Sequence, residues 1–216
     1  MKIDMQHLIA AWQRSAALHD LRKGASEAEI QEFEGAVGWK LPSEWRRLYA
    51  FTNGADLLEG NIAFHPLTGV ELSLRQASAS LRAWEWPVPN ELWIAGDNGQ
   101  GEPFGLWVPA ATPEAAPIVA IGQIFEPGCL AVAGSSLEAF LLARTAYYLL
   151  LCEAPREALD AIGLPDELRV EDPDEDIWIA IGRWADPARP GTSDDPYEAE
   201  LDAPTVRGLL GTKNVL

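Results

Sequence analysis

The chain has 216 residues and a formal net charge of −17, from 33 acidic and 16 basic side chains. This charge argues against direct binding to nucleic acid or to an anionic membrane, because the phosphates of both repel it. It favours a basic protein partner, or else it only keeps the protein soluble. With 48% hydrophobic residues, the chain can form one domain with a sizeable core.

An amphipathic helix is predicted near residues 4–20, because apolar residues recur there at helical spacing. This helix would place His7 and His19 on its surface. A second helix is predicted to begin at Ser26, where "SEAE" forms a capping box with Glu29, and to end at Gly38.

The stretch "LPSEWRRLYAFTNG" (residues 41–54) predicts a third helix. Pro42 suits the first turn of a helix, and Asn53-Gly54 suits its C-terminal end. One side of this helix is expected to be buried and the other to face water. The expected buried residues are Trp45, Leu48 and Tyr49, and those expected to face water are Glu44, Arg46 and Arg47.

Short strands dominate the middle of the chain. "NIAFHPL" (61–67) predicts a strand with Ile62 and Phe64 on one face, and a helix is predicted over residues 73–84, ended by "WEWPVP". Four further strands are predicted within residues 92–95, 104–108, 117–121 and 130–133. A long helix should follow, with Ser135 and Glu138 as a second capping box.

The domain organisation follows from the change in composition near residue 150. Residues 1–150 are predicted to form one α+β domain, and residues 151–216 an acidic C-terminal extension that is partly irregular. The N-terminus lacks a signal-peptide pattern, and the longest apolar run is too short to span a bilayer. Cys129 and Cys152 form no C-x-x-C pair and are expected to be reduced, buried thiols. These features predict a cytoplasmic location.

No catalytic or metal-binding motif stands out. "GDNGQG" (96–101) lacks the lysine of a phosphate-binding loop and the carboxylate register of a calcium loop, so it indicates a hairpin turn. The three histidines, His7, His19 and His65, do not assemble with other residues into a catalytic or metal-ligating pattern. We therefore expect no cofactor, no metal and no catalytic residues.

Four acidic residues on two turns are the candidate partner-binding site. Asp56 and Glu59 follow the third predicted helix, and Asp97 and Glu102 flank the hairpin turn. If the two turns converge, these carboxylates form an acidic patch beside aromatic residues that suits an arginine-rich partner. The alternative is that they are scattered solubilising charges.

The order of these signals resembles the SUKH superfamily, the SMI/KNR-type group named partly for a fungal regulator of cell-wall synthesis. The first block is an apolar-Glu pair, a Leu-Pro, an aromatic residue and an Asn-Gly. They correspond here to Phe33-Glu34, Leu41-Pro42, Trp45 and Asn53-Gly54, with Trp45 in place of the more usual tyrosine or phenylalanine. "WIAGDNGQGEPFGLWV" and "LAVAGSSLEAFLLAR" resemble the later blocks, so the resemblance covers roughly residues 20–145.

The resemblance implies an α+β fold with helices packed on one side of a mainly antiparallel sheet. It also implies a non-catalytic, protein-binding function, since bacterial members of the family act as immunity proteins against polymorphic toxins, often nucleases. The partner would then be a basic toxin domain. The alternatives are a regulatory adaptor close to the fungal branch, and an enzyme with an unrecognised site. The oligomeric state does not follow from the sequence.

Overall fold

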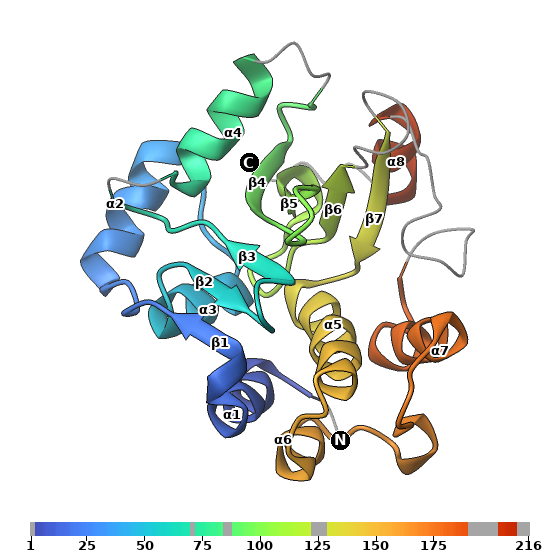
Figure 1. Cartoon of the computed structure of the whole chain (residues 1–216). Helices are drawn as coiled ribbons and strands as arrows, with labels where there is room; N and C mark the ends of the chain where they lie inside the picture. The colour runs from blue at the N-terminus through green and yellow to red at the C-terminus, as the bar shows by residue number, and fades with distance from the viewer. Residues whose placement is uncertain (1–2, 70–71, 84–87, 122–128, 190–202, 211–216) are drawn as a thin grey trace.

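The computed structural model describes residues 3–69, 72–83, 88–121, 129–189 and 203–210 (Figure 1). Most of "WEWPVP" and most of the Pro- and Asp-rich segment before residue 203 lie outside the described residues. The helices in the described part are α1 (Met5–Arg14), α2 (Glu27–Val37), α3 (Ser43–Phe51), α4 (Leu74–Ala83), α5 (Leu137–Leu151), α6 (Arg156–Ala161), α7 (Glu175–Ala185) and α8 (Ala203–Leu210).

Seven strands form one antiparallel sheet whose order is the order of the sequence. They are β1 (His19–Leu21), β2 (Ala55–Leu57), β3 (Ile62–Phe64), β4 (Leu92–Asp97), β5 (Pro103–Trp107), β6 (Ile118–Ile121) and β7 (Leu130–Gly134). The predicted α+β class and the antiparallel sheet are confirmed.

The two faces of the sheet bury different residues, because successive side chains of a strand alternate between faces. On one face, Phe64, Phe104 and Leu106 join the main core, to which α1, α2, α3 and α5 also contribute. On the other face, residues of β4 to β7 pack with Ala77 of α4 and Val206 of α8. Figure 1 shows α4 next to β4 and α8 next to β7. The expectation of helices on one side therefore needs a correction, since α4 and α8 cover the second face.

The N-terminal helix is shorter than predicted. α1 ends at Arg14, where the Ser15 hydroxyl donates to the Ala11 carbonyl, and the chain then enters β1. His19 is therefore not on a helix: it lies half-buried on β1, and its Nδ1 accepts a hydrogen bond of 3.2 Å from the Leu58 amide. The helical spacing continued past residue 14, but pairing of β1 with β2 satisfies the backbone instead.

The family-like stretch of residues 33–46 is held together by a buried carboxylate. Glu34 on α2 is 2% exposed, accepts a hydrogen bond from the Leu41 amide at 3.0 Å, and pairs with Lys40 at 2.7 Å. Arg46, which was expected to face water, is half-buried and bridges Glu34 and Glu27. Glu34 therefore fixes the approach of α3 to α2.

Glu44 is the clearest departure from the sequence prediction. It was expected to face water, yet it is 1% exposed. Its carboxylate accepts hydrogen bonds from the backbone amides of Ala116 (3.0 Å), Leu137 (3.0 Å) and Glu138 (3.2 Å). Two of these amides belong to the first turn of α5, which has no partners for them within the helix. Glu44 thus connects α3 to α5 and to the segment before β6.

The start of α5 also differs from the predicted capping box. The N-cap is Ser136, whose hydroxyl accepts from the Ala139 amide at 3.1 Å. Ser135 instead bonds the buried Asp186, and Glu138 pairs with Arg47 and accepts from the Met5 amide. These contacts attach the start of α1 and the end of α7 to the start of α5.

Substitution Ser136→Ala is expected to lower the free energy of unfolding by about 1 kcal/mol, because it leaves an amide of the first helical turn without its cap. Ser80→Ala on α4 is the control, since Ser80 is exposed and is not an N-cap. Urea denaturation followed by circular dichroism measures both. Equal midpoints for the two variants would contradict the assignment of the cap to Ser136.

Helices α6 and α7 are part of the main core. Leu159 and Ile162 around α6, and Ile181 of α7, belong to the cluster that also contains Trp45 and Phe104. Residues 151–189 therefore pack on the first 150 residues, through contacts of α6 with α1 and of α7 with α5.

Candidate functional site

The face of β1 to β4 that lies opposite the main core carries a row of carboxylates. Asp20, Asp56 and Ala63 are direct partners across the antiparallel ladders, and Ala63 in turn pairs with Asp97. Direct partners in antiparallel strands point to the same face. Asp20 and Asp56 are exposed and Asp97 is partly exposed, so the row is open to solvent. We call Asp20, Asp56 and Asp97, with Glu59 and Glu102 at their margin, the acidic face.

The four predicted acids were all expected on turns, but Asp56 lies at the centre of β2 and Asp97 at the end of β4, and only Glu59 and Glu102 lie on the adjoining turns. These two turns converge. A Cβ on Gly99, in the turn between β4 and β5, would lie 2.0 Å from the carbonyl oxygen of Gly60, in the turn between β2 and β3. Gly99 also has φ of +75°, a left-handed conformation that favours glycine. Both the close approach and the backbone conformation therefore require glycine at this position. Glu59 lies in the turn between β2 and β3. Glu102 lies at the end of the turn between β4 and β5, where its carboxylate accepts a hydrogen bond of 2.7 Å from the side-chain amide of Asn98. The structure therefore brings the four predicted acids to one region.

Two details of the predicted patch change. Phe64 of β3 and Phe104 of β5 belong to the main core on the other face of the sheet, so these aromatic rings do not border the carboxylates. Asp20 was missed, because the sequence pattern placed it in the first helix. The signal that could have found it is the alternation of "HDL", in which Asp20 is exposed between two half-buried residues.

The carboxylates of the acidic face have few internal partners. Within the described ranges, none of the five forms an ion pair with Lys, Arg or His. Asp97 accepts from the Gly99 amide at 2.8 Å, and Glu59 lies 3.9 Å from the Cys152 thiol. Arg22 borders the face where β1 ends, with its side chain passing over Gly54. Like charges on neighbouring strands repel, so this surface gains from a cationic partner.

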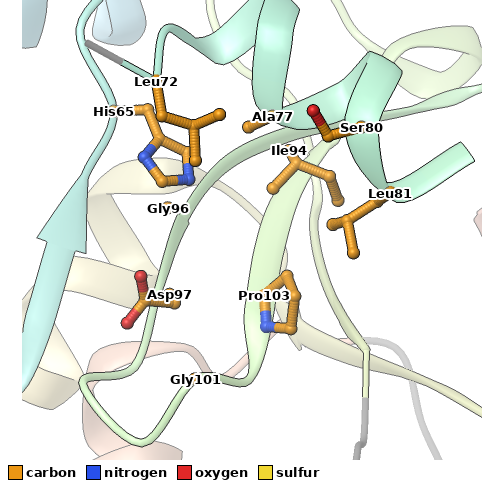
Figure 2. A pocket seen from close by; sticks show the side chains of 10 residues that line it. All are labelled: His65, Leu72, Ala77, Ser80, Leu81, Ile94, Gly96, Asp97, Gly101 and Pro103. Atoms are coloured by element: carbon orange, nitrogen blue, oxygen red, sulfur yellow. The ribbon is translucent and has the colours of Figure 1, made fainter. Parts of the chain in front are cut away.

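A pocket of about 380 Å³ opens beside Asp97, between α4 and the hairpin of β4 and β5. Its apolar walls come from Leu72, Leu81, Ile94 and Pro103. Figure 2 shows the side chains of His65 and Asp97 on one side of the pocket, and those of Ala77, Ser80 and Leu81 of α4 on the other. The size lies at the lower end of the range for small-ligand sites.

His65 is the only histidine that lines this pocket among the described residues. Burial lowers its pKa, although the nearby Asp97 carboxylate acts in the opposite direction. Its imidazole is therefore neutral near pH 7 and can accept a hydrogen bond. Neither ring nitrogen has a hydrogen-bond partner among the described residues, so His65 offers an unused polar group.

The other histidines are structural. Burial lowers the pKa of His19 to about 4, and its imidazole bonds the Leu58 amide and Ser15. His7 pairs with Asp4 at the start of α1 at 2.7 Å. In the part of the chain that the structure describes, no group of three His, Cys, Asp or Glu side chains is placed to hold a metal ion.

Both cysteines are free and half-buried rather than fully buried. Burial and the neighbouring Glu59 carboxylate raise the pKa of Cys152, so its thiol stays protonated at neutral pH. None of the helices in the described ranges is long and apolar enough to cross a membrane.

Comparison with known proteins gives one family. The profile described as SMI1 / KNR4 family (SUKH-1) matches residues 24–143. The matched region begins just before α2 and ends within α5, so it contains β2 to β7 and four of the five residues of the acidic face. No curated protein matches the chain.

Proposed function

This chain belongs to the SMI1 / KNR4 family (SUKH-1), and from that premise we propose that it is a non-catalytic protein-binding domain that acts as an immunity protein. Its partner is a basic toxin domain, which docks on the acidic face. The chain neutralises the toxin by covering its active cleft or an adjacent surface.

The observation that carries this proposal is the row of Asp20, Asp56 and Asp97 on an open sheet face. Neighbouring strands are about 5 Å apart, so the carboxylates of Asp56 and Asp97 are separated by about 10 Å. That spacing suits several Lys or Arg side chains of one partner. Because these carboxylates have no internal ion pairs among the described residues, a cationic partner displaces no existing bridge, and its new ion pairs offset the cost of removing the carboxylates from water.

The acidity supports rapid association as well as binding. A net charge of −17 accelerates the encounter with a basic domain, and salt screens this attraction over about 8 to 10 Å. The association rate should therefore fall as the ionic strength rises. If the charge only keeps the protein soluble, this salt dependence does not come from the carboxylates of the acidic face.

The test begins with co-purification from the native host, where a basic protein is expected to be retained by the tagged chain. The triple variant Asp20→Asn, Asp56→Asn and Asp97→Asn should lose most of this retention and slow association by about tenfold or more. The matched control is Glu157→Gln, Glu167→Gln and Glu171→Gln, which changes the net charge equally at exposed positions outside the face. Equal losses in both variants, or no protein partner under any condition, would overturn the proposal.

A further inference from the structure

We infer that the pocket between α4 and the β4–β5 hairpin receives one arginine side chain of the protein partner. This inference rests on the proposed function and names the contact that would anchor the partner. It concerns the cavity of about 380 Å³ beside Asp97.

The walls of the pocket suit an aliphatic stem. Leu72, Leu81, Ile94 and Pro103 line it, and Leu72 is 49% exposed, which is unusual for a leucine on this chain. An arginine carries three methylene groups, which pack on such surfaces while the charged end reaches a polar group. Covering Leu72 in this way also removes apolar surface from water.

The polar side of the pocket suits a planar cation. One oxygen of Asp97 accepts from the Gly99 amide, and the other has no partner among the described residues. His65 lies on the same side with two unused ring nitrogens, and burial keeps it neutral, so it accepts rather than repels a cation (Figure 2). A guanidinium has five N–H donors in a fixed plane and can donate to both groups at once, which an ammonium does less well.

Other ligand classes fit less well. A phosphate or carboxylate would meet the Asp97 carboxylate, and no lysine or arginine is among the described residues that line the pocket. A purely apolar side chain would cover the second Asp97 oxygen and the His65 ring nitrogens without offering them a hydrogen bond, which is unfavourable for buried polar groups. Arginine is also among the residues that most often dominate the energy of a protein interface. The remaining carboxylates of the acidic face would receive further basic residues around this anchor.

The first experiment titrates the isotope-labelled full chain with N-acetyl-arginine N-methylamide and follows the backbone amides by NMR. The largest shifts are expected at Gly96, Asp97 and Gly101, which line the pocket. The matched control ligand is the citrulline compound, which has nearly the same shape and no charge. It should bind at least about tenfold more weakly, because the charge-assisted hydrogen bond to Asp97 is lost. Equal binding of both ligands, or shifts spread over the whole acidic surface, would overturn the inference.

Variants separate the pocket from the charged face around it. Asp97→Asn keeps an oxygen for the Gly99 amide but should lower the affinity for the arginine compound by about tenfold. Asp56→Asn also removes one negative charge, two strands away, and should lower this affinity by only about twofold. Equal effects would show a diffuse charge effect without an anchor. The proposed function would survive that result, because its own test compares the acidic triple variant with the matched triple control in binding to the protein partner.

Discussion

Replacement of Glu44 by alanine is expected to lower the free energy of unfolding by about 3 to 5 kcal/mol. The carboxylate is 1% exposed and accepts from three backbone amides, at Ala116, Leu137 and Glu138. Alanine would leave these donors buried without partners, each at a cost of about 1 to 3 kcal/mol that partial hydration reduces. Denaturant unfolding followed by tryptophan fluorescence measures the loss. Replacement of the exposed Glu114 by alanine is the control and should cost less than about 0.5 kcal/mol.

The same residue predicts an unusual dependence of stability on pH. Burial raises the pKa of Glu44 from its ordinary value of 4.5 to about 7, against the opposite effect of its three amide donors. The folded chain thus binds this proton more tightly than the unfolded chain does. Its contribution to stability is complete below about pH 4.5 and is lost as the pH rises through about 7, by on the order of 3 kcal/mol in total.

The variant Glu44→Gln isolates this effect, because glutamine does not titrate. As the pH rises from 4.5 to 7.5, the free energy of unfolding of the wild type should fall relative to that of the Glu44→Gln variant. Every other titrating group is common to both chains and cancels. A difference that stays constant over this range would mean that the amide donors hold Glu44 ionised, and the pH prediction would be wrong.

Replacement of Trp45 by alanine is expected to cost about 3 to 5 kcal/mol, because it empties a large fully buried site. Trp45 is 0% exposed, stacks on Tyr49 with ring centres 6.1 Å apart, and meets Phe64 edge-on at 6.2 Å. Its loss would loosen the contact between α3 and the sheet. Calorimetry measures the effect as a fall in the melting temperature and in the enthalpy of unfolding.

Trp45→Phe should be much milder, by about 1 to 2 kcal/mol. The indole Nε1 of Trp45 is buried and has no hydrogen-bond partner among the described residues, so phenylalanine removes an unpaired donor along with some ring volume. This result would also explain why the position accepts the smaller aromatic residues that are more usual in the family pattern. A phenylalanine variant as unstable as the alanine variant would contradict it.

Much of the fold could be predicted because its signals are local. The capping box of Ser26 and Glu29, the left-handed Gly38, and the strands of the hairpin region all depend on a few neighbouring residues, and the structure has them as predicted. The exposure of Glu44 and Arg46 could not be predicted in the same way. Glu44 bonds the amides of Leu137 and Glu138 on α5, and Arg46 pairs with Glu34 on α2. Only the folded chain brings these elements together.

The candidate site was predicted in part for the same reason. The four predicted acids were all expected on turns, which are visible in the sequence; the structure places Glu59 and Glu102 on turns, but Asp56 at the centre of β2 and Asp97 at the end of β4. Their convergence depends on the register of β2, β3 and β4, which no short pattern gives. The pocket was missed because its lining residues come from α4, β4, β5 and the end of β3, and only their packing creates a cavity.

The strand order of the sheet also bears on self-association. Among the described residues, the strands run from β1 to β7 in order and these two outer strands form the edges of the sheet, where a strand of another molecule could be added. The β1 edge is protected by its length of three residues and by the exposed Asp20 at its centre. In a dimer that pairs two β1 edges about their centres, Asp20 would be brought close to its own copy, so a charge that we propose to serve recognition also opposes this form of aggregation.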